Sequence, residues 1–149
     1  MLRPGVLPGV VLEIPSDTEF LSLVREVTKR VAELAGFPEK TAAEVALAVD
    51  ECATNVIKHA YQGATDERIE LRLEYRGLAL EIEVRDTGAA LDPSARPKVD
   101  LDLYAAERRK GGLGVHLMEK IMDSVSYRRS ARRNVCCLVK HKAAQPAPD

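Results

Sequence analysis

Apolar residues recur along this chain with two different periods, and these periods outline its secondary structure. A short apolar run over 10–14 predicts a strand, which Pro15 ends because proline cannot donate a hydrogen bond to a sheet. Residues 16–36 carry apolar side chains at spacings of three and four, and the same pattern returns over 38–60. Such spacings keep the apolar side chains on one face, so two amphipathic helices are predicted.

After residue 68 the period changes to two. Apolar residues alternate with charged ones over 68–75 and again over 78–85, which predicts a hairpin with one buried and one charged face. The segment 93–110 contains two prolines, many charges and little periodicity, so we expect a loop there. The last predicted elements are a helix after the glycines at 111–114 and strands over 125–129 and 135–141.

This order of elements predicts an α/β (α+β) two-layer sandwich, in which helices cover one face of a mixed, mostly antiparallel sheet. The chain has 149 residues, 46% hydrophobic and 30% charged, which is the size and balance of one globular domain. We expect a single domain over 10–142, preceded by a loose N-terminus over 1–9 and followed by a disordered tail over 143–149.

The charge balance argues against polyanionic partners. Lys and Arg number 22 and Asp and Glu number 23, so the formal net charge is -1 and no global field favours nucleic acid or a membrane surface. One dense basic stretch is present near the C-terminus, and we interpret it as a solvated turn and strand edge rather than a docking surface for an acidic partner. It consists of Arg128, Arg129, Arg132 and Arg133.

The cysteines and the apolar runs indicate a cytoplasmic protein. Three cysteines, of which Cys136 and Cys137 are adjacent, do not form a disulfide framework or a zinc motif, so we expect small apolar fillers in a reducing compartment. The first thirty residues do not resemble a signal peptide, and no apolar run approaches the ~20 residues that span a bilayer.

The second predicted helix carries the polar residues that suggest chemistry. Glu51 and Asn55 are four residues apart and therefore lie on the same helix face. An amide oxygen can ligate Mg²⁺, which prefers oxygen ligands and keeps several waters, while a carboxylate can take a proton from a hydroxyl group. The helix alone leaves a solvated polar stripe as an equal alternative.

Two further segments fit a nucleotide site. Asp86 and Gly88 follow a predicted strand, where a carboxylate can accept from an exocyclic amine and a glycine lets a flat ring approach, although such a pair is usually only a turn. The glycines at 111–114 precede a helix, whose N-terminus favours phosphates, with Lys110 beside it as a cation. A flexible hinge is the alternative for these glycines.

The order and separation of these segments resemble the N box, G1 box and G2 box of the GHKL superfamily of ATPases and kinases. The three segments are 51–55, 86–88 and 112–114. The chain is similar above all to the anti-sigma-factor serine/threonine kinases, whose helix reads much as residues 49–61 read here. The resemblance extends over about 10–142, nearly the whole chain.

The resemblance implies the Bergerat, or histidine-kinase-like, ATP-binding fold, with ATP and Mg²⁺ as cofactors. It makes Glu51 the general base, Asn55 the magnesium ligand and Asp86 the contact to adenine. By the same matching, Gly88 lies beneath the nucleotide and 93–110 forms the ATP lid.

The resemblance also implies a phosphate-binding segment. This chain departs from the family pattern at two places. Lys110 takes the place of a basic residue that can reach the terminal phosphate. The G1 box of the family commonly continues with a second glycine, whereas this chain has alanines at 89–90. The last strand of the family often has a Gly-Thr pair near adenine, and at this place the chain has Asn134, to which we assign the contact near adenine. The residues implied along the phosphates are Lys110, Gly111, Gly112, Leu113 and Gly114.

The implied function is an ATP-dependent serine/threonine protein kinase that acts by partner switching. It phosphorylates a small anti-sigma-factor antagonist protein and sequesters a sigma factor or an analogous target, and related proteins often form homodimers. Two alternatives remain open at this point: a non-catalytic sequestering module that uses ATP as a structural ligand, and an ATPase without a protein acceptor.

Overall fold

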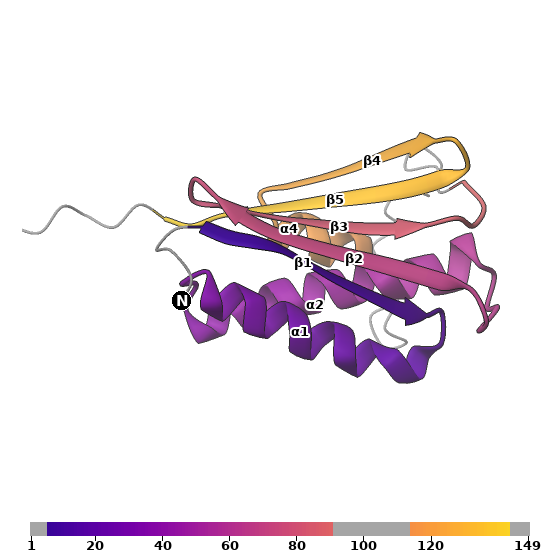
Figure 1. Ribbon diagram of the computed structural model, residues 1–149, viewed down its shortest axis with the longest axis horizontal. Helices are drawn as coiled ribbons and strands as arrows, with labels where there is room; N and C mark the ends of the chain where they lie inside the picture. The colour runs from indigo at the N-terminus through magenta and orange to yellow at the C-terminus, as the bar shows by residue number, and fades with distance from the viewer. Residues whose placement is uncertain (1–5, 91–113, 144–149) are drawn as a thin grey trace, which may run out of the picture.

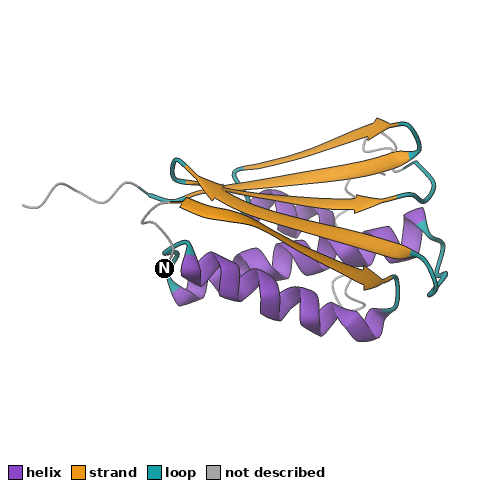
Figure 2. Ribbon diagram, viewed as in Figure 1, coloured by secondary structure: helices purple, strands orange, loops and turns teal. Residues whose placement is uncertain are grey.

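The computed structural model describes residues 6–90 and 114–143 of the chain as one sheet with helices on one side (Figure 1). Figure 2 shows the two layers, with the strands above and the helices below. The predicted two-layer sandwich is confirmed. In chain order the elements are β1 (Val6–Pro15), η1 (Thr18–Phe20), α1 (Leu21–Leu34), α2 (Glu39–Asn55), η2 (Val56–Ala60), β2 (Arg68–Arg76), β3 (Ala79–Asp86), α4 (Gly114–Ile121), β4 (Ser124–Ser130) and β5 (Arg133–His141).

The five described strands lie in the order β1-β2-β3-β5-β4, and all four pairings between them are antiparallel. The sequence predicted a mixed, mostly antiparallel sheet. In the described part of the chain every strand pairing is antiparallel. Short turns link β2 to β3 and β4 to β5, and consecutive strands joined by short turns pair antiparallel, whereas β1–β2 and β3–β5 are joined through helices.

The core lies between the sheet and the helices. Alternate residues of β2 and β3 point toward the helices and are buried, among them Leu73, Leu80 and Ile82 at 0% exposure. They pack with the apolar faces of α1 and α2, including Val24 and Val49. The period of two in the strands and of three to four in the helices therefore predicted the buried faces correctly.

The first strand starts earlier than the sequence pattern predicted. β1 begins at Val6, and Leu7 is buried and pairs with Tyr75 of β2, so 6–9 do not form the expected loose segment. The register shifts between Leu7 and Val10, in a stretch that contains a proline, which has no N–H to donate to a sheet. Residues 1–5 and the tail over 144–149 lie outside the described residues.

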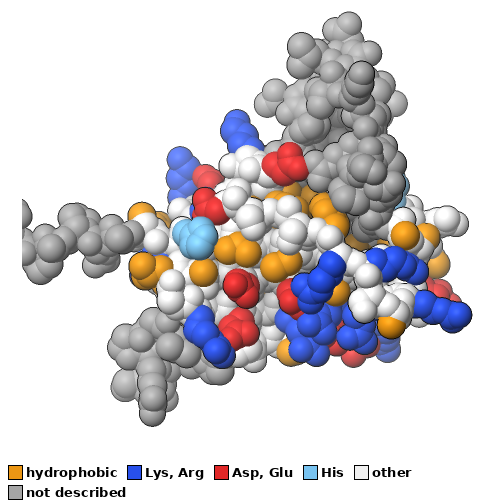
Figure 3. All heavy atoms as spheres, turned by 90° about the horizontal axis from the view of Figure 1, so that it is seen from above, with side chains coloured by type: hydrophobic (Ala, Val, Ile, Leu, Met, Phe, Trp, Pro, Cys, Tyr) orange, Lys and Arg blue, Asp and Glu red, His pale blue; other side chains and the backbone are white. Residues whose placement is uncertain are grey.

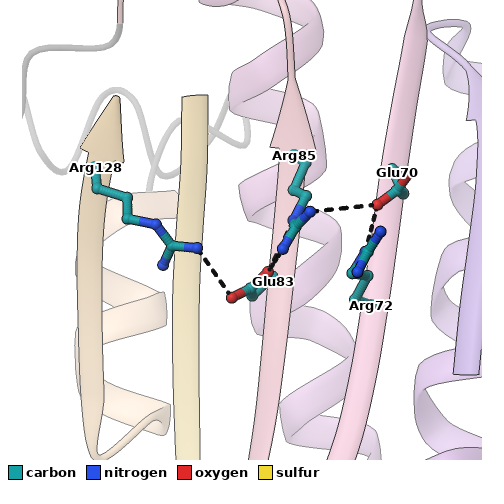
Figure 4. A network of polar contacts seen from close by, with 5 residues as sticks. All are labelled: Glu70, Arg72, Glu83, Arg85 and Arg128. Carbon is teal, nitrogen blue, oxygen red and sulfur yellow. Dashed lines mark hydrogen bonds and ion pairs between the residues drawn. The ribbon is translucent and has the colours of Figure 1, made fainter. Parts of the chain in front are cut away.

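The outer face of the sheet, away from the helices, carries charges of both signs (Figure 3). Five side chains form a network across it, shown in Figure 4. Arg128 of β4 approaches Glu83 of β3 at 3.2 Å, Arg85 bonds to Glu83 at 2.5 Å and approaches Glu70 at 3.8 Å, and Arg72 bonds to Glu70. The dense basic stretch lies on the edge strand β4, in the turn after it and at the start of β5, and it is not wholly solvated as predicted, because Arg128 pairs within the protein.

Candidate functional site

One face of α2 is polar. It carries Glu51 and Asn55 one helical turn apart, and both side chains are partly buried. Burial raises the pKa of Glu51, the nearby Asp50 carboxylate raises it further, and the Lys58 ammonium lowers it. A carboxylate with a raised pKa is a better proton acceptor near neutral pH, which is what a general base requires.

Asp50 has a different role from its neighbour Glu51. Its Oδ1 lies 3.2 Å from Nη1 of Arg25, which belongs to α1. Burial raises the pKa of Asp50, and the charge and hydrogen bond of Arg25 oppose this. Because this ion pair joins α1 to α2, Asp50 contributes to helix packing and holds the helix that carries Glu51.

The helix ends in a wider, π-helical turn, η2, and Tyr61 follows it directly. The Tyr61 hydroxyl donates to the carbonyl of Arg68 at 2.5 Å and accepts from the backbone N–H of Thr87 at 2.9 Å. This one side chain therefore ties the end of the helix to the start of β2 and the end of β3. Sequence reasoning missed this role, for which the only signal was a tyrosine immediately after the polar helix.

Asp86 is the last residue of β3, and it is 3% exposed. Its Oδ1 accepts from the backbone N–H of Gly88 at 2.9 Å and from the side-chain amide of Asn134 at 2.8 Å. Burial raises the pKa of Asp86, while these two hydrogen bonds and the charge of Arg129 lower it. The result is a buried carboxylate that is held in one orientation at the end of a strand.

Gly88 lies against the end of the helix. A Cβ atom on Gly88 would be 2.4 Å from the carbonyl oxygen of Ala60, so only glycine fits. The next residue, Ala89, donates its backbone N–H to the same oxygen at 2.8 Å. A groove of about 330 Å³ adjoins this contact, lined by Ala60, Tyr61, Gln62, Ala64, Glu67, Thr87, Gly88 and Ala89. The position of Gly88 beneath a nucleotide stays a prediction.

Asn134 and Arg129 meet at the same place from the β4–β5 hairpin. The Asn134 amide donates to Asp86, and it donates to the carbonyl of Ala89 at 2.8 Å. Arg129 donates to Oδ1 of Asn134 at 2.8 Å and to the carbonyl of Gly88 at 3.1 Å. Sequence reasoning placed Asn134 near this site but missed Arg129, which it treated as part of a solvated basic stretch.

The helix that carries Glu51 and Asn55 packs against β3 and β5, and its extension η2 meets the chain that leaves β3, where Gly88 lies against Ala60. Cys52 of α2 is a buried free cysteine, and a hydrogen bond with the Cys136 thiol of β5, burial and the charge of Asp86 raise the pKa of the Cys52 thiol. α4 packs against α2 and begins at Gly114, as the glycine pattern predicted. The other predicted phosphate residues, Lys110, Gly111, Gly112 and Leu113, and the lid over 93–110 lie outside the described residues.

A family model described as the histidine kinase-like ATPase domain matches residues 14–140 of this chain. The chain belongs to that family. Within this ATPase family it is a relative of the serine-protein kinases named RsbW. The RsbW of Listeria innocua is 34% identical over 121 residues, which cover 78% of this chain and 76% of that protein. The RsbW of Bacillus subtilis is 28% identical over 121 residues, 78% of this chain and 75% of that protein.

Two solved structures share the fold of this ATPase-family chain. One contains the RsbU and RsbW domains of Rv1364c from Mycobacterium tuberculosis, with a TM-score of 0.65 and 14% identity over 91% of this chain and 32% of that one. The other is the SiaB–SiaC complex from Pseudomonas aeruginosa, with a TM-score of 0.58 and 12% identity over 92% of this chain and 90% of that one. At these identities the likeness extends to the fold alone.

The oxygen ligands that α2 offers in this histidine kinase-like domain fit a cation that is also coordinated by substrate phosphates. Within 6–90 and 114–143, no group of three or more His, Cys, Asp or Glu side chains could hold a metal ion. Mg²⁺ commonly binds through one or two side chains and completes its shell with waters and substrate phosphates. A single amide oxygen beside a carboxylate on α2 suits that mode.

None of the described helices is long and apolar enough to cross a membrane.

Proposed function

We propose that this chain is an ATP-dependent serine/threonine protein kinase that acts as a partner-switching regulator of the anti-sigma-factor type. The observation that carries the proposal is the contact between the helix that carries Glu51 and Asn55, at its extension η2, and the chain that leaves β3 after Asp86, where Gly88 and Ala89 meet Ala60. This geometry occurs in a chain whose family is the histidine kinase-like ATPases and whose relatives are named serine-protein kinases.

In this proposal ATP lies between the end of β3 and the polar face of α2. Asp86 accepts a hydrogen bond from the amino group of adenine, and its burial supports this role because a dry carboxylate gains more from each hydrogen bond. Gly88 lies beneath the nucleotide. Asn55 holds Mg²⁺, which would offset negative charge on the phosphates when bound.

Glu51 is the proposed general base. It takes the proton from a serine or threonine hydroxyl of the acceptor as the phosphoryl group moves, and its partly buried position with a raised pKa supports this role. The N-terminus of α4 and the glycine segment before it bind the phosphates, with Lys110 at the terminal phosphate. The segment 93–110 acts as the lid.

The proposed partners are proteins. The acceptor is a small antagonist that is phosphorylated on Ser or Thr, and the second partner is a sigma factor or an analogous target that the kinase sequesters. The names of the relatives support the kinase step, and a fold neighbour crystallised as a two-protein complex is consistent with partner binding. We further propose that the protein is a cytoplasmic homodimer of a single domain that includes β1 from Val6 onward.

Incubation of the full chain with γ-labelled ATP and a candidate antagonist tests the proposal. We expect labelled antagonist, and we expect Glu51→Ala to bind ATP as the wild type does while transfer falls by about 10²- to 10⁴-fold, the usual contribution of a general base. Glu26→Gln, an exposed carboxylate on α1, is the control and should transfer normally.

The products of the same incubation separate the alternatives. Free phosphate without labelled protein would indicate an ATPase that has no protein acceptor. Bound but unchanged ATP would indicate a sequestering module that uses the nucleotide as a structural ligand. Full transfer activity in the Glu51→Ala protein would contradict the role of Glu51.

A further inference from the structure

The side-chain amide of Asn134 is fully engaged by the protein. An asparagine amide has two hydrogens to donate and one oxygen that accepts. Nδ2 donates to Oδ1 of Asp86 and to the carbonyl of Ala89, both at 2.8 Å, and lies 3.3 Å from the carbonyl of Gly88. Oδ1 of Asn134 accepts from Arg129 at 2.8 Å. In this arrangement both hydrogens are committed within the chain, so Asn134 has no donor left for a ligand.

The bonds to Asp86 leave one of its oxygens for a ligand. Its Oδ1 accepts from Asn134 and from the backbone N–H of Gly88. Both of these donations, which are the ones described for this carboxylate, end on the same oxygen. The carboxylate plane is therefore fixed, and Oδ2 is the oxygen that remains to accept a hydrogen bond.

Three neighbouring strands contribute to this arrangement. Arg129 of β4 is the cross-strand partner of Asn134 of β5, which is the cross-strand partner of Asp86 of β3. Arg129 also donates to the carbonyl of Gly88 at 3.1 Å. The row of three side chains thus fixes both the carboxylate and the backbone that leaves β3 over 86–89.

We propose that Asn134 and Arg129 are positioning residues for nucleotide recognition, and that they orient Asp86 so that its Oδ2 selects a purine with an amino group at ring position 6. This inference rests on the proposed role of Asp86 in ATP binding. Neither residue touches the nucleotide. An amino group donates to the oriented oxygen, whereas the oxo group of inosine or guanosine triphosphate places an acceptor against it.

The protonation of Asp86 provides a second readout. The titratable groups described around it are Arg129 of β4 and Cys52 of α2. Burial raises the pKa of Asp86, and Asn134, the N–H of Gly88 and Arg129 lower it. Removal of Asn134 or Arg129 therefore leaves a higher pKa, and binding of ATP is lost at a higher pH as the solution is acidified.

The test measures dissociation constants of the full chain for ATP and for inosine triphosphate by calorimetry, from acid to neutral pH. Asn134→Asp keeps the shape and replaces the amide donors by a second carboxylate, so ATP binding should weaken by about 10- to 100-fold and its preference over inosine triphosphate should disappear. Arg129→Gln should weaken ATP binding by about 2- to 5-fold, because Arg129 is exposed and its charge is screened.

Matched variants separate positioning from general damage. Arg128→Gln changes the adjacent residue, which pairs with Glu83 on the outer face, and should behave as the wild type does. Arg129→Lys retains the positive charge but lacks the planar guanidinium group. We therefore expect the acid midpoint, the pH at which half of the ATP binding is lost on acidification, to stay near the wild-type value in Arg129→Lys. In Arg129→Gln we expect this pH to be higher. Should Asn134→Asp not fold, the two Arg129 variants carry the test.

Two outcomes are distinguishable. If Asn134→Asp and Arg129→Gln retain the nucleotide preference and the acid midpoint of Arg128→Gln, the positioning role is wrong. If the wild type does not bind ATP, or if Asp86→Asn binds it unchanged, the proposed nucleotide site itself is wrong.

Discussion

The close contact between Gly88 and Ala60, the last residue of η2, allows a stability prediction to be worked out from distances. Gly88→Ala would place a Cβ 2.4 Å from the carbonyl oxygen of Ala60 and 2.6 Å from its carbonyl carbon. These are backbone atoms, so the strand end and the helix end must separate by about 1 Å to restore an ordinary van der Waals distance. That movement stretches the 2.8 Å hydrogen bond from Ala89 to the same oxygen beyond its useful range.

The expected cost has two parts. Overpacking of this size costs about 1–3 kcal/mol, and loss of the buried hydrogen bond costs about 1 kcal/mol more. Replacement of a glycine returns about 0.4–1 kcal/mol by restricting the unfolded chain. We therefore expect the free energy of unfolding to fall by about 1–3.6 kcal/mol, which for a domain of this size lowers Tm by about 2–14 °C.

Thermal and urea unfolding of Gly88→Ala and a control measure this effect. Gly9→Ala suits the control, because a Cβ at Gly9 meets no atom within 4 Å. We expect Gly9→Ala to remain within about 0.5 kcal/mol of the wild type. If Gly88→Ala unfolds at the temperature of the control, contact with Ala60 is not what requires glycine. Loss of ATP affinity without loss of stability would then favour the predicted place of Gly88 beneath the nucleotide.

Two further predictions concern a buried hydroxyl and a buried acid. Thr28 of α1 is buried, and its Oγ1 has no hydrogen-bond partner among the described residues, so Thr28→Val should raise the free energy of unfolding by about 1 kcal/mol; a lower urea midpoint would contradict this. Glu51 must be ionised to act as a base, and burial and Asp50 raise its pKa above the ordinary 4.5, so transfer should fall with acid at a higher pH than for an unperturbed glutamate. Asp50→Asn should move that pH–rate midpoint downward, and an unchanged midpoint would argue that Glu51 is not the titrating group.

The sequence by itself determined most of the secondary structure of the described residues, because its hydrophobic periods are local properties. Alternation predicted the hairpin of β2 and β3 together with its buried face, and Gly36, with a φ of +98°, ends α1 where a glycine is favoured. The helix that carries Glu51 and Asn55 was also predicted, since a four-residue spacing fixes which side chains share a face. The strand end at Asp86 followed from the end of the alternation.

Tertiary structure decided which of these segments meet and what each polar group bonds to. Val6 and Leu7 belong to β1 because β2 offers them partners, although Pro8 and Gly9 made the segment look loose in the sequence. The requirement for glycine at position 88 comes from a carbonyl 28 residues earlier in the chain, at Ala60.

The setting of Asp86 was likewise invisible in the sequence. Arg129 stands in a run of arginines and resembles a solvated charge, yet pairing across three strands places it on Asn134 and on the chain that leaves β3. Periodicity identifies the face on which a side chain lies, but the partner of a hydrogen bond depends on strand register, which joins residues far apart in the chain. The sequence therefore identified candidate site residues, and the fold set the orientation of those that the structure describes.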